Sequence, residues 1–338
     1  MNKSSIFFIA LIACLFFAPY FFKTYIIGYD SYYFLRMGWL TSNIIVAKLV
    51  LFAALASSAV IIGYLGRGIN PKNGWLAGVF VFFSPIFFTE FLKFEPEAIA
   101  YPFLFASLIF FLQKKLQRKI IGIVLVLIAA FFWLPGLSWL LPTAFLFPPA
   151  IIILIPFLPA AISNYQYFLP HPGVQESFAI MQGVSFHYLL LFFGILGLVL
   201  VFRRPEWKNI KPLLPFLVVF LVMASLNGKF GVFLAPLLAV FMANAWDYFG
   251  KIREMMPILM VFCCVGLAVS VLFVYEPTDQ LVENAKNAVA DANEATICNS
   301  WTYGHLLEWL GGHPIAKAGG LQPDCNAQCP GCPTFFYA

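Results

Sequence analysis

Residues 43–65, NIIVAKLVLFAALASSAVIIGYL, are apolar apart from Lys48 and a few small polar side chains. A helix needs about 20 residues to cross roughly 30 Å of hydrocarbon, so this stretch is long enough to span a membrane. The whole chain has the same character, with 62% hydrophobic and 10% charged residues among 338. Soluble domains carry roughly 25% charged residues. The sequence therefore predicts a polytopic membrane protein.

Apolar stretches of this kind recur and predict an all-α bundle of about nine or ten transmembrane helices. The expected spans lie near residues 5–22, 43–65, 75–92, 98–113, 120–136, 184–202, 212–226, 230–249 and 255–275. Segment 137–162 is apolar but rich in proline, so we expect a broken helix that is re-entrant or lies along the outer leaflet. The predicted domains are a transmembrane domain, residues 1–275, and a small external domain with cysteines, residues 276–338.

Clusters of Lys and Arg separate the expected spans, for example KKLQRK at residues 114–119 and RRPEWKNIK at residues 203–211. The positive-inside rule places these loops in the cytoplasm, which puts most acids on the other side. We expect a multi-pass integral protein of the cell membrane whose active site and C-terminus are extracytoplasmic. The net charge of +5 is then mostly an insertion signal, and nucleic acid is not an expected partner.

Four carboxylates stand in the outer loops: Asp30 in GYDSYYFLRM, Glu95 and Glu97 in FEPEAIAYPF, and Glu176 in HPGVQESF. Pro96 suits the first position of the next helix, which would place Glu95 and Glu97 at the positive end of its dipole. Oxygen ligands suit a hard divalent cation such as Mg²⁺ or Mn²⁺, which acts as a Lewis acid on phosphate oxygens. These acids point to a substrate with a phosphate head and a lipid tail; acids that are merely solvated are the alternative.

Five segments, taken in order, resemble the catalytic subunit of oligosaccharyltransferase, a GT-C membrane glycosyltransferase. They are DSYYFLR (30–36), EPEAIAYPF (95–103), GVQES (173–177), LNGKFGVFLAPLLAVFMA (226–243) and NSWTYGHLLEWLGGHP (299–314). The resemblance runs through most of the chain. It implies a GT-C-like bundle and an inverting, metal-dependent transferase. Such an enzyme moves a glycan from a polyprenyl, dolichyl-type pyrophosphate carrier to the asparagine of an acceptor polypeptide.

The resemblance also implies roles for individual residues. Asp30, Glu95 and Glu97 would hold the metal on the pyrophosphate, Asp30 and Glu176 would bind the acceptor amide as catalytic residues, Lys229 and Arg36 would contact the lipid pyrophosphate, and Trp301 and Tyr303 would line the acceptor groove. A Lys229 that snorkels at a helix end is the alternative for that residue. For Arg36 the alternative is a pair with Asp30 or a lipid headgroup.

The chain departs from the family at the external motif W-W-D-Y-G, which aligns with SWTYG at residues 300–304. The missing first Trp and Asp help the family bind the hydroxyl of an Asn-x-Ser/Thr acceptor. Two further functions therefore stay open: a GT-C transferase that uses a polyprenyl-monophosphate sugar with a lipid or glycan acceptor, and a non-catalytic membrane homologue. A partner subunit that supplies an external domain also stays open. Without the resemblance, WTYGHLLEWLGGHP reads as an amphipathic helix capped by Gly311 and Gly312.

Four cysteines fall in the predicted external domain, namely Cys298, Cys325, Cys329 and Cys332. Outside the cytoplasm two disulfides are the simpler interpretation, whereas a zinc site is the alternative, because sequence spacing does not fix connectivity. No catalytic role is expected for these residues.

Overall fold

The computed structural model describes residues 1–157, 188–202, 204, 207–226, 228–269, 271–272, 277, 279–293, 295–299, 303–314 and 334–335. The chain divides into two compact units, each assembled from separate stretches of sequence. The helical unit contains residues 1–16, 53–91 and 96–265, and the mixed unit contains residues 17–52, 92–95 and 266–338.

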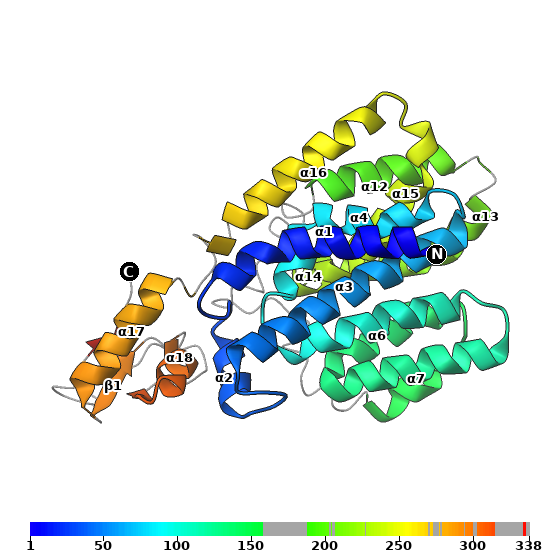
Figure 1. The fold of residues 1–338 in the computed structure, drawn as a ribbon. Coiled ribbons are helices and arrows are strands. Elements are labelled where there is room, and N and C mark those ends of the chain that lie inside the picture. Colours follow the sequence, from blue (N-terminus) through cyan, green and yellow to red (C-terminus); the bar gives the residue numbers. More distant parts are fainter. Residues whose placement is uncertain are drawn as a thin grey trace. The chain divides into compact units, whose positions relative to one another are not determined.

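The helical unit consists of apolar helices (Figure 1). Its longer helices are α1 (Lys3–Phe22), α3 (Ile44–Ile69), α6 (Pro96–Phe111), α7 (Leu116–Phe132), α12 (Tyr188–Val201), α14 (Leu214–Leu226), α15 (Leu234–Asn244) and α16 (Ile252–Val269), of which α1, α3 and α16 also supply residues to the mixed unit. Shorter pieces are α13 (Trp207–Ile210), η7 (Lys211–Leu213), η8 (Gly228–Phe233) and η9 (Trp246–Tyr248). Helix α6 packs along α7, and α12 packs along α15.

Glycines allow helices of the helical unit to approach each other closely. A Cβ atom on Gly197 of α12 would lie 2.6 Å from the carbonyl oxygen of Phe241 in α15. A Cβ atom on Gly78, in the short helix α4 (Ala77–Phe80), would lie 2.5 Å from the oxygen of Ala59 in α3. Small residues let helix backbones approach this closely in membrane proteins. The helical unit is therefore packed in the manner of a membrane bundle.

The structure corrects the predicted span at residues 75–92. Four short helices occupy this stretch: η1 (Gly74–Leu76), α4, η2 (Val81–Phe83) and α5 (Pro85–Glu90). The backbone is extended at Ser84, whose Oγ accepts a hydrogen bond from the Phe87 N–H at 3.3 Å. A serine N-cap followed by proline at the first helical position starts a new helix, so the apolar run is interrupted there.

Segment 134–157 forms the short helices η3 (Leu134–Trp139), α8 (Leu140–Thr143), α9 (Ala150–Leu154) and η4 (Ile155–Phe157). This matches the broken helix expected for residues 137–162, as far as residue 157. The fully buried Trp139 anchors the segment in an aromatic core, with the ring centroids of Phe220 and Phe233 at 4.6 and 4.9 Å.

Within the described residues, three helical stretches are long and apolar enough to cross a membrane: Lys3–Phe22, Ile44–Ile69 and Trp207–Ser225. Shorter apolar helices occupy Gly74–Phe83, Pro96–Phe111, Leu190–Val201 and Phe230–Asn244. The apolar helices indicate a membrane protein. A count of nine or ten spans and the orientation of the chain stay predictions.

The mixed unit adds short helices and strands. Its elements are α2 (Asp30–Arg36), α17 (Asp279–Ala292), β1 (Thr296–Asn299), α18 (Gly304–Trp309), β2 (His313–Pro314) and β3 (Thr334–Phe335). The strands form a parallel sheet in the order β2-β1-β3, in which Thr296 is opposite His313 and Cys298 is opposite Thr334. The all-α prediction is thus corrected for this unit. Strands of two to four residues are too short to show a periodic pattern in the sequence.

Candidate active site

Two loops that carry predicted site acids are joined in the mixed unit. The first leads from α1 to Asp30 at the start of α2, and the second, residues 92–95, ends at Glu95. Ile27 of the first loop pairs with Lys93 of the second in an isolated parallel bridge. The backbone segments that lead to the two acids therefore lie side by side.

The hydroxyl group of Tyr20, near the end of α1, connects these two loops. It accepts a hydrogen bond from the Ile27 N–H at 3.2 Å and donates one to the Leu92 carbonyl oxygen at 2.6 Å. Tyr20 is fully buried. The Lys48 ammonium group donates to the Tyr20 carbonyl oxygen at 3.1 Å and lies 4.8 Å from the centre of the Tyr20 ring. The phenol is therefore held on both sides.

Ser31 makes a second connection between the same loops. Its Oγ donates to the Ile27 carbonyl oxygen and accepts from the Phe94 N–H, both at 2.8 Å. Ser31 and Phe94 are fully buried. The residue that follows Asp30 thus binds the residue that precedes Glu95.

The three acids predicted to hold a metal have different surroundings. Asp30 is exposed at the first position of α2. Glu95 and Glu97 are buried, with 7% and 5% of their surface exposed. Glu97 lies in the first turn of α6 behind Pro96, so the helix starts where the sequence predicts, and it belongs to the helical unit.

The residues that the structure describes contain no group of three His, Cys, Asp or Glu side chains placed to hold a metal ion. The oxygens of Asp30, Glu95 and Glu97 have the right chemistry for Mg²⁺ or Mn²⁺, yet they do not form such a group. Glu176 and the side chain of Lys229 lie outside the described residues, although the Lys229 backbone belongs to η8.

Helix α2 packs its aromatic and basic side chains against α18. Two ring pairs join the helices, Tyr32 with Trp309 and Tyr33 with His305, both at 5.0 Å between centroids. A third pair joins the residues that precede the helices, Tyr29 and Tyr303, at 5.3 Å. At the end of α2, Arg36 forms an ion pair with Glu308, whose side chain is only 10% exposed. The helix that starts with Asp30 is therefore fixed to α18 along its length.

The segment predicted to bind the acceptor leads directly into α18. Tyr303 is 8% exposed, and Trp301 lies outside the described residues. The helix ends at Trp309 with Leu310 as its C-cap, and Gly311, which follows, has φ of +93°. The Gly311 N–H donates to the Glu308 oxygen at 3.1 Å and the Gly312 N–H to the Leu307 oxygen at 2.9 Å. This is a Schellman motif, so the two glycines cap the helix as the sequence predicts.

Cys298 is buried in β1 and takes part in a disulfide bond. Cys325, Cys329 and Cys332 lie outside the described residues. A disulfide-bonded sulfur is not a zinc ligand, so in the structure Cys298 has a structural function.

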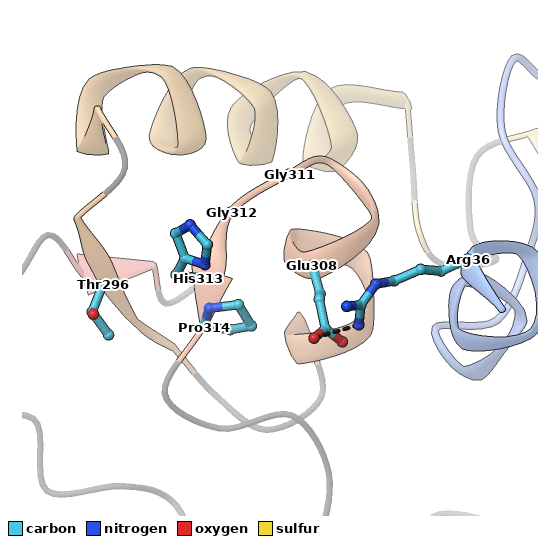
Figure 2. A pocket seen from close by; sticks show the side chains of 7 residues that line it. All are labelled: Arg36, Thr296, Glu308, Gly311, Gly312, His313 and Pro314. Carbon is cyan, nitrogen blue, oxygen red and sulfur yellow. Dashed lines mark ion pairs between the residues drawn. The ribbon is translucent and has the colours of Figure 1, made fainter.

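A polar pocket of about 400 Å³ opens between α2, α18 and the sheet (Figure 2). Its lining residues are Arg36, Thr296, Glu308, Gly311, Gly312, His313 and Pro314. Figure 2 shows the Arg36 guanidinium group reaching the Glu308 carboxylate at one end, while His313 and Pro314 extend from β2. The pocket thus offers hydrogen-bond donors and acceptors beside the segment predicted to bind the acceptor.

Two solved structures share this architecture. The crystal structure of the Archaeoglobus fulgidus oligosaccharyltransferase in the apo form aligns with a TM-score of 0.66 over 93% of this chain, at 12% identity. The archaeal oligosaccharyltransferase AglB from Archaeoglobus fulgidus, in complex with an inhibitory peptide and a dolichol-phosphate, aligns with a TM-score of 0.61 over 94% of this chain, also at 12% identity. The chain has an oligosaccharyltransferase fold. It spans 64% of the length of each neighbour. No protein-family model and no curated protein matches the sequence.

Within the oligosaccharyltransferase fold, the structure adds residues that the sequence did not single out. Tyr20 and Ser31 connect the acid-bearing loops, and Glu308 holds Arg36. Glu90 of α5 is 6% exposed and accepts a hydrogen bond from the Tyr101 hydroxyl at 3.2 Å. Glu90 interrupts the apolar run FFTEF, and a buried acid in such a run is costly unless it has a partner. This interruption of the apolar run was the feature of the sequence from which a buried, hydrogen-bonded role for Glu90 could have been predicted.

Proposed function

We propose that this chain is a membrane glycosyltransferase of the oligosaccharyltransferase type. It transfers a glycan from a polyprenyl, dolichyl-type carrier to the asparagine of an acceptor polypeptide on the extracytoplasmic face. The observation that carries the proposal is the position of α2. Asp30 starts this helix, Ser31 binds the loop of Glu95, and the remaining turns pack against α18, which continues the SWTYG segment. Parts predicted to serve the donor and the acceptor therefore meet on one short helix.

The fold comparison supports this choice of donor and acceptor classes. One neighbour was solved with a dolichol-phosphate and an inhibitory peptide. A lipid-linked donor and a peptide acceptor for this chain agree with that complex, and they also agree with the phosphate-and-lipid substrate inferred from the acids in the outer loops.

In the proposed reaction, the acceptor amide nitrogen attacks the anomeric carbon of the glycan. A C–N bond forms while the C–O bond to the carrier phosphate breaks, and the polyprenyl pyrophosphate leaves with the electron pair. The amide proton passes to a carboxylate or to the leaving phosphate, and attack from the opposite side inverts the anomeric centre. Asp30 and Glu176 would accept hydrogen bonds from the amide and orient its nitrogen. Lys229 and Arg36 would stabilise the charge on the leaving group.

A divalent cation, Mg²⁺ or Mn²⁺, remains part of the proposal, and Asp30, Glu95 and Glu97 are the carboxylates that would have to come together to hold it. When bound, it would act as a Lewis acid on the phosphate oxygens. A metal titration tests this part separately. Transfer that proceeds at full rate in excess chelator would remove the cation from the proposal and leave the transfer itself intact.

The SWTYG segment favours a second candidate, because the missing Trp and Asp are the family residues that bind the acceptor hydroxyl. This candidate is a GT-C transferase that adds a sugar from a polyprenyl monophosphate to a lipid or glycan. A partner subunit that supplies acceptor-binding residues would instead restore the first function. Transfer to a peptide separates these cases.

The deciding experiment is a transfer assay with the purified chain in detergent. The assay mixture contains Mn²⁺, a lipid-linked oligosaccharide extract and a fluorescent Asn-x-Thr peptide, and a Gln-x-Thr peptide serves as the matched control. We expect a glycosylated product from the Asn peptide only. Product from neither peptide, together with sugar transfer from a polyprenyl-monophosphate donor to a lipid acceptor, would overturn the proposal in favour of the second candidate.

A further inference from the structure

We propose that Tyr20 and Ser31 are positioning residues that set the spacing between the loop of Asp30 and the loop of Glu95. Neither residue supplies a group to the reaction. This inference rests on the proposed function for its effect on catalysis, whereas the loop spacing itself can be tested without any activity.

The first argument is the geometry of the hydrogen bonds. The Tyr20 hydroxyl group accepts a hydrogen bond from the Ile27 N–H in the first loop and donates one to the Leu92 carbonyl oxygen in the second. The Ser31 hydroxyl group donates to the Ile27 carbonyl oxygen in the first loop and accepts a hydrogen bond from the Phe94 N–H in the second. Each hydroxyl group therefore joins backbone atoms of two segments that are far apart in the sequence. An isolated β-bridge supplies little pairing of its own, so side-chain bonds of this kind fix the register.

The second argument is burial. Tyr20, Ser31, Leu92 and Phe94 are all fully buried. Where water cannot replace a lost partner, removal of one hydroxyl group leaves backbone donors and acceptors unsatisfied, and the loops must move to regain partners. The bonds are thus positioned to transmit a small change in Tyr20 or Ser31 to the chain beside both acids.

The third argument is the closeness of the two loops at Gly28. This residue has φ of +85°, and a Cβ atom on it would lie 3.2 Å from both Lys93 Cγ and Ser31 Oγ. Glycine allows this backbone conformation and this approach. The first loop is therefore shaped to lie against the second, and the two hydroxyl groups hold it there.

The test compares Tyr20→Phe and Ser31→Ala with Tyr32→Phe. The control removes a buried phenol hydroxyl of the same kind, but the Tyr32 hydroxyl group donates to the Ile26 carbonyl oxygen at 3.0 Å, and Ile26 belongs to the first loop. Amide hydrogen exchange of the full chain in nanodiscs is followed in peptides that cover residues 26–31 and 92–95. Because the Ile27 and Phe94 amides are themselves the bonded donors, exchange reports the bonds directly.

We expect Tyr20→Phe, which removes the acceptor of the Ile27 amide, to speed exchange at residues 26–31 by about fivefold to tenfold, as expected for one lost buried hydrogen bond. Ser31→Ala removes the acceptor of the Phe94 amide and should speed exchange at residues 92–95 by the same factor, and Tyr20→Phe should also speed exchange there because its bond to Leu92 is lost. Tyr32→Phe should leave the peptide of residues 92–95 unchanged. In the transfer assay, both test variants should lower kcat by about tenfold to a hundredfold with little change in the KM for the peptide, since misplaced groups slow the chemical step. Tyr32→Phe should keep kcat near the wild-type value.

Unchanged exchange at residues 92–95 in both test variants would overturn the proposal, as would an equal fall in kcat for the Tyr32→Phe control. If either test variant fails to fold, the other still decides, because each removes a different hydroxyl group. A wild-type protein without transfer activity would count against the proposed function. The exchange comparison would then still decide whether Tyr20 and Ser31 hold the loops together.

Discussion

Asp30 and Glu97 are two carboxylates on which the proposed chemistry depends, and their surroundings differ. Asp30 is exposed at the start of α2, where an incoming amide can reach it, whereas Glu97 is buried in the first turn of α6. The N-terminal turn of a helix favours a negative charge, which lowers the cost of a buried carboxylate there. The two acids are therefore suited to different tasks, the first to a mobile substrate and the second to a fixed partner.

Replacing either acid by its amide should stop transfer without affecting membrane insertion. We expect Asp30→Asn and Glu97→Gln each to lower kcat by at least about a hundredfold, the range seen when one group that stabilises a transition state is removed. The measurement is peptide transfer by purified variants, with Asp291→Asn, on the exposed face of α17, as the control. Wild-type turnover by either variant would contradict the assignment.

Glu283 and Lys286 of α17 form a charged cluster with Tyr25. The Glu283 carboxylate lies 2.9 Å from the Lys286 Nζ and accepts a bond from the Tyr25 hydroxyl at 2.9 Å. The bonds from Lys286 and Tyr25 lower the pKa of Glu283 below its ordinary value of 4.5. The bonds to Tyr25 and Glu283 raise the pKa of Lys286 above its ordinary value of 10.5. The two shifts stabilise the folded chain over the pH range between those ordinary values.

The sign of the pH dependence follows from these shifts. The contribution of Glu283 is complete above pH 4.5 and is lost as the pH falls through its lower folded pKa, because protonation removes the charge that Lys286 binds. The Tm difference between wild type and Glu283→Gln should therefore be constant at neutral pH and shrink in acid. It should be small and smaller still at high salt, since both side chains are exposed. A difference that grows in acid would be inconsistent with this cluster.

For single residues, the sequence singled out the acids but not the residues that connect the loops on which Asp30 and Glu95 lie. Asp30, Glu95 and Glu97 stand out because carboxylates are rare in so apolar a chain. Tyr20 and Ser31 do not stand out, because tyrosine and serine are common in membrane helices and loops. Their importance depends on Leu92 and Phe94, and a contact between residues about 60 to 70 positions apart leaves no local pattern.

The elements show where local signals are sufficient. The predicted span at 98–113 corresponds to α6, that at 120–136 to α7 and that at 5–22 to α1. The end of α18 follows from its two glycines alone. At Ser84 the same kind of signal was present in the sequence, since Ser-Pro starts a helix, but the apolar run around it hid the break. The short strands β2 and β3 could not be predicted, because they exist only by pairing with β1.

The Schellman motif at the end of α18 gives a prediction for one glycine. Gly311→Ala should destabilise the mixed unit by about 1 kcal/mol, since alanine in the left-handed region costs roughly that much. No atom lies within 4 Å of the added Cβ, so backbone strain is the whole effect. Thermal unfolding and amide exchange of residues 304–312 measure this loss of stability. Gly68→Ala in α3, also with no atom within 4 Å and without a positive φ, is the control, and equal behaviour of the two variants would refute the motif's contribution.

The whole molecule consists of two units with different chemistry. The helical unit depends on apolar packing through small residues and aromatic rings. The mixed unit is a smaller assembly in which single polar bonds join distant segments, such as the bond from Lys23 Nζ to the Val271 oxygen at 3.2 Å. Composition predicted the apolar helices of the first unit, because hydropathy is a property of each segment alone. It could not predict which stretches make up the second unit.

Reduction of the disulfide at Cys298 should affect the mixed unit selectively. We expect the free energy of unfolding of the mixed unit to fall by about 2–4 kcal/mol, the usual contribution of a native disulfide. Amide exchange with and without reductant should then speed up in residues 279–299 while residues 98–111 stay protected. Cys14→Ala should respond as the wild type does, because Cys14 is a free cysteine. Equal loss of protection in both regions would show that the two units do not unfold separately.

The assembly of the mixed unit from the beginning and the end of the chain has a consequence for biosynthesis. Tyr25 bonds to Glu283, which is 258 residues further along. At about 5–20 residues per second, a ribosome needs roughly 13–50 s to add that length. During this interval α2 has been synthesised but α18 has not, so the aromatic side chains of α2 do not yet have the partners in α18 that they contact in the folded chain. Slow translation of the last third of the chain would lengthen this interval.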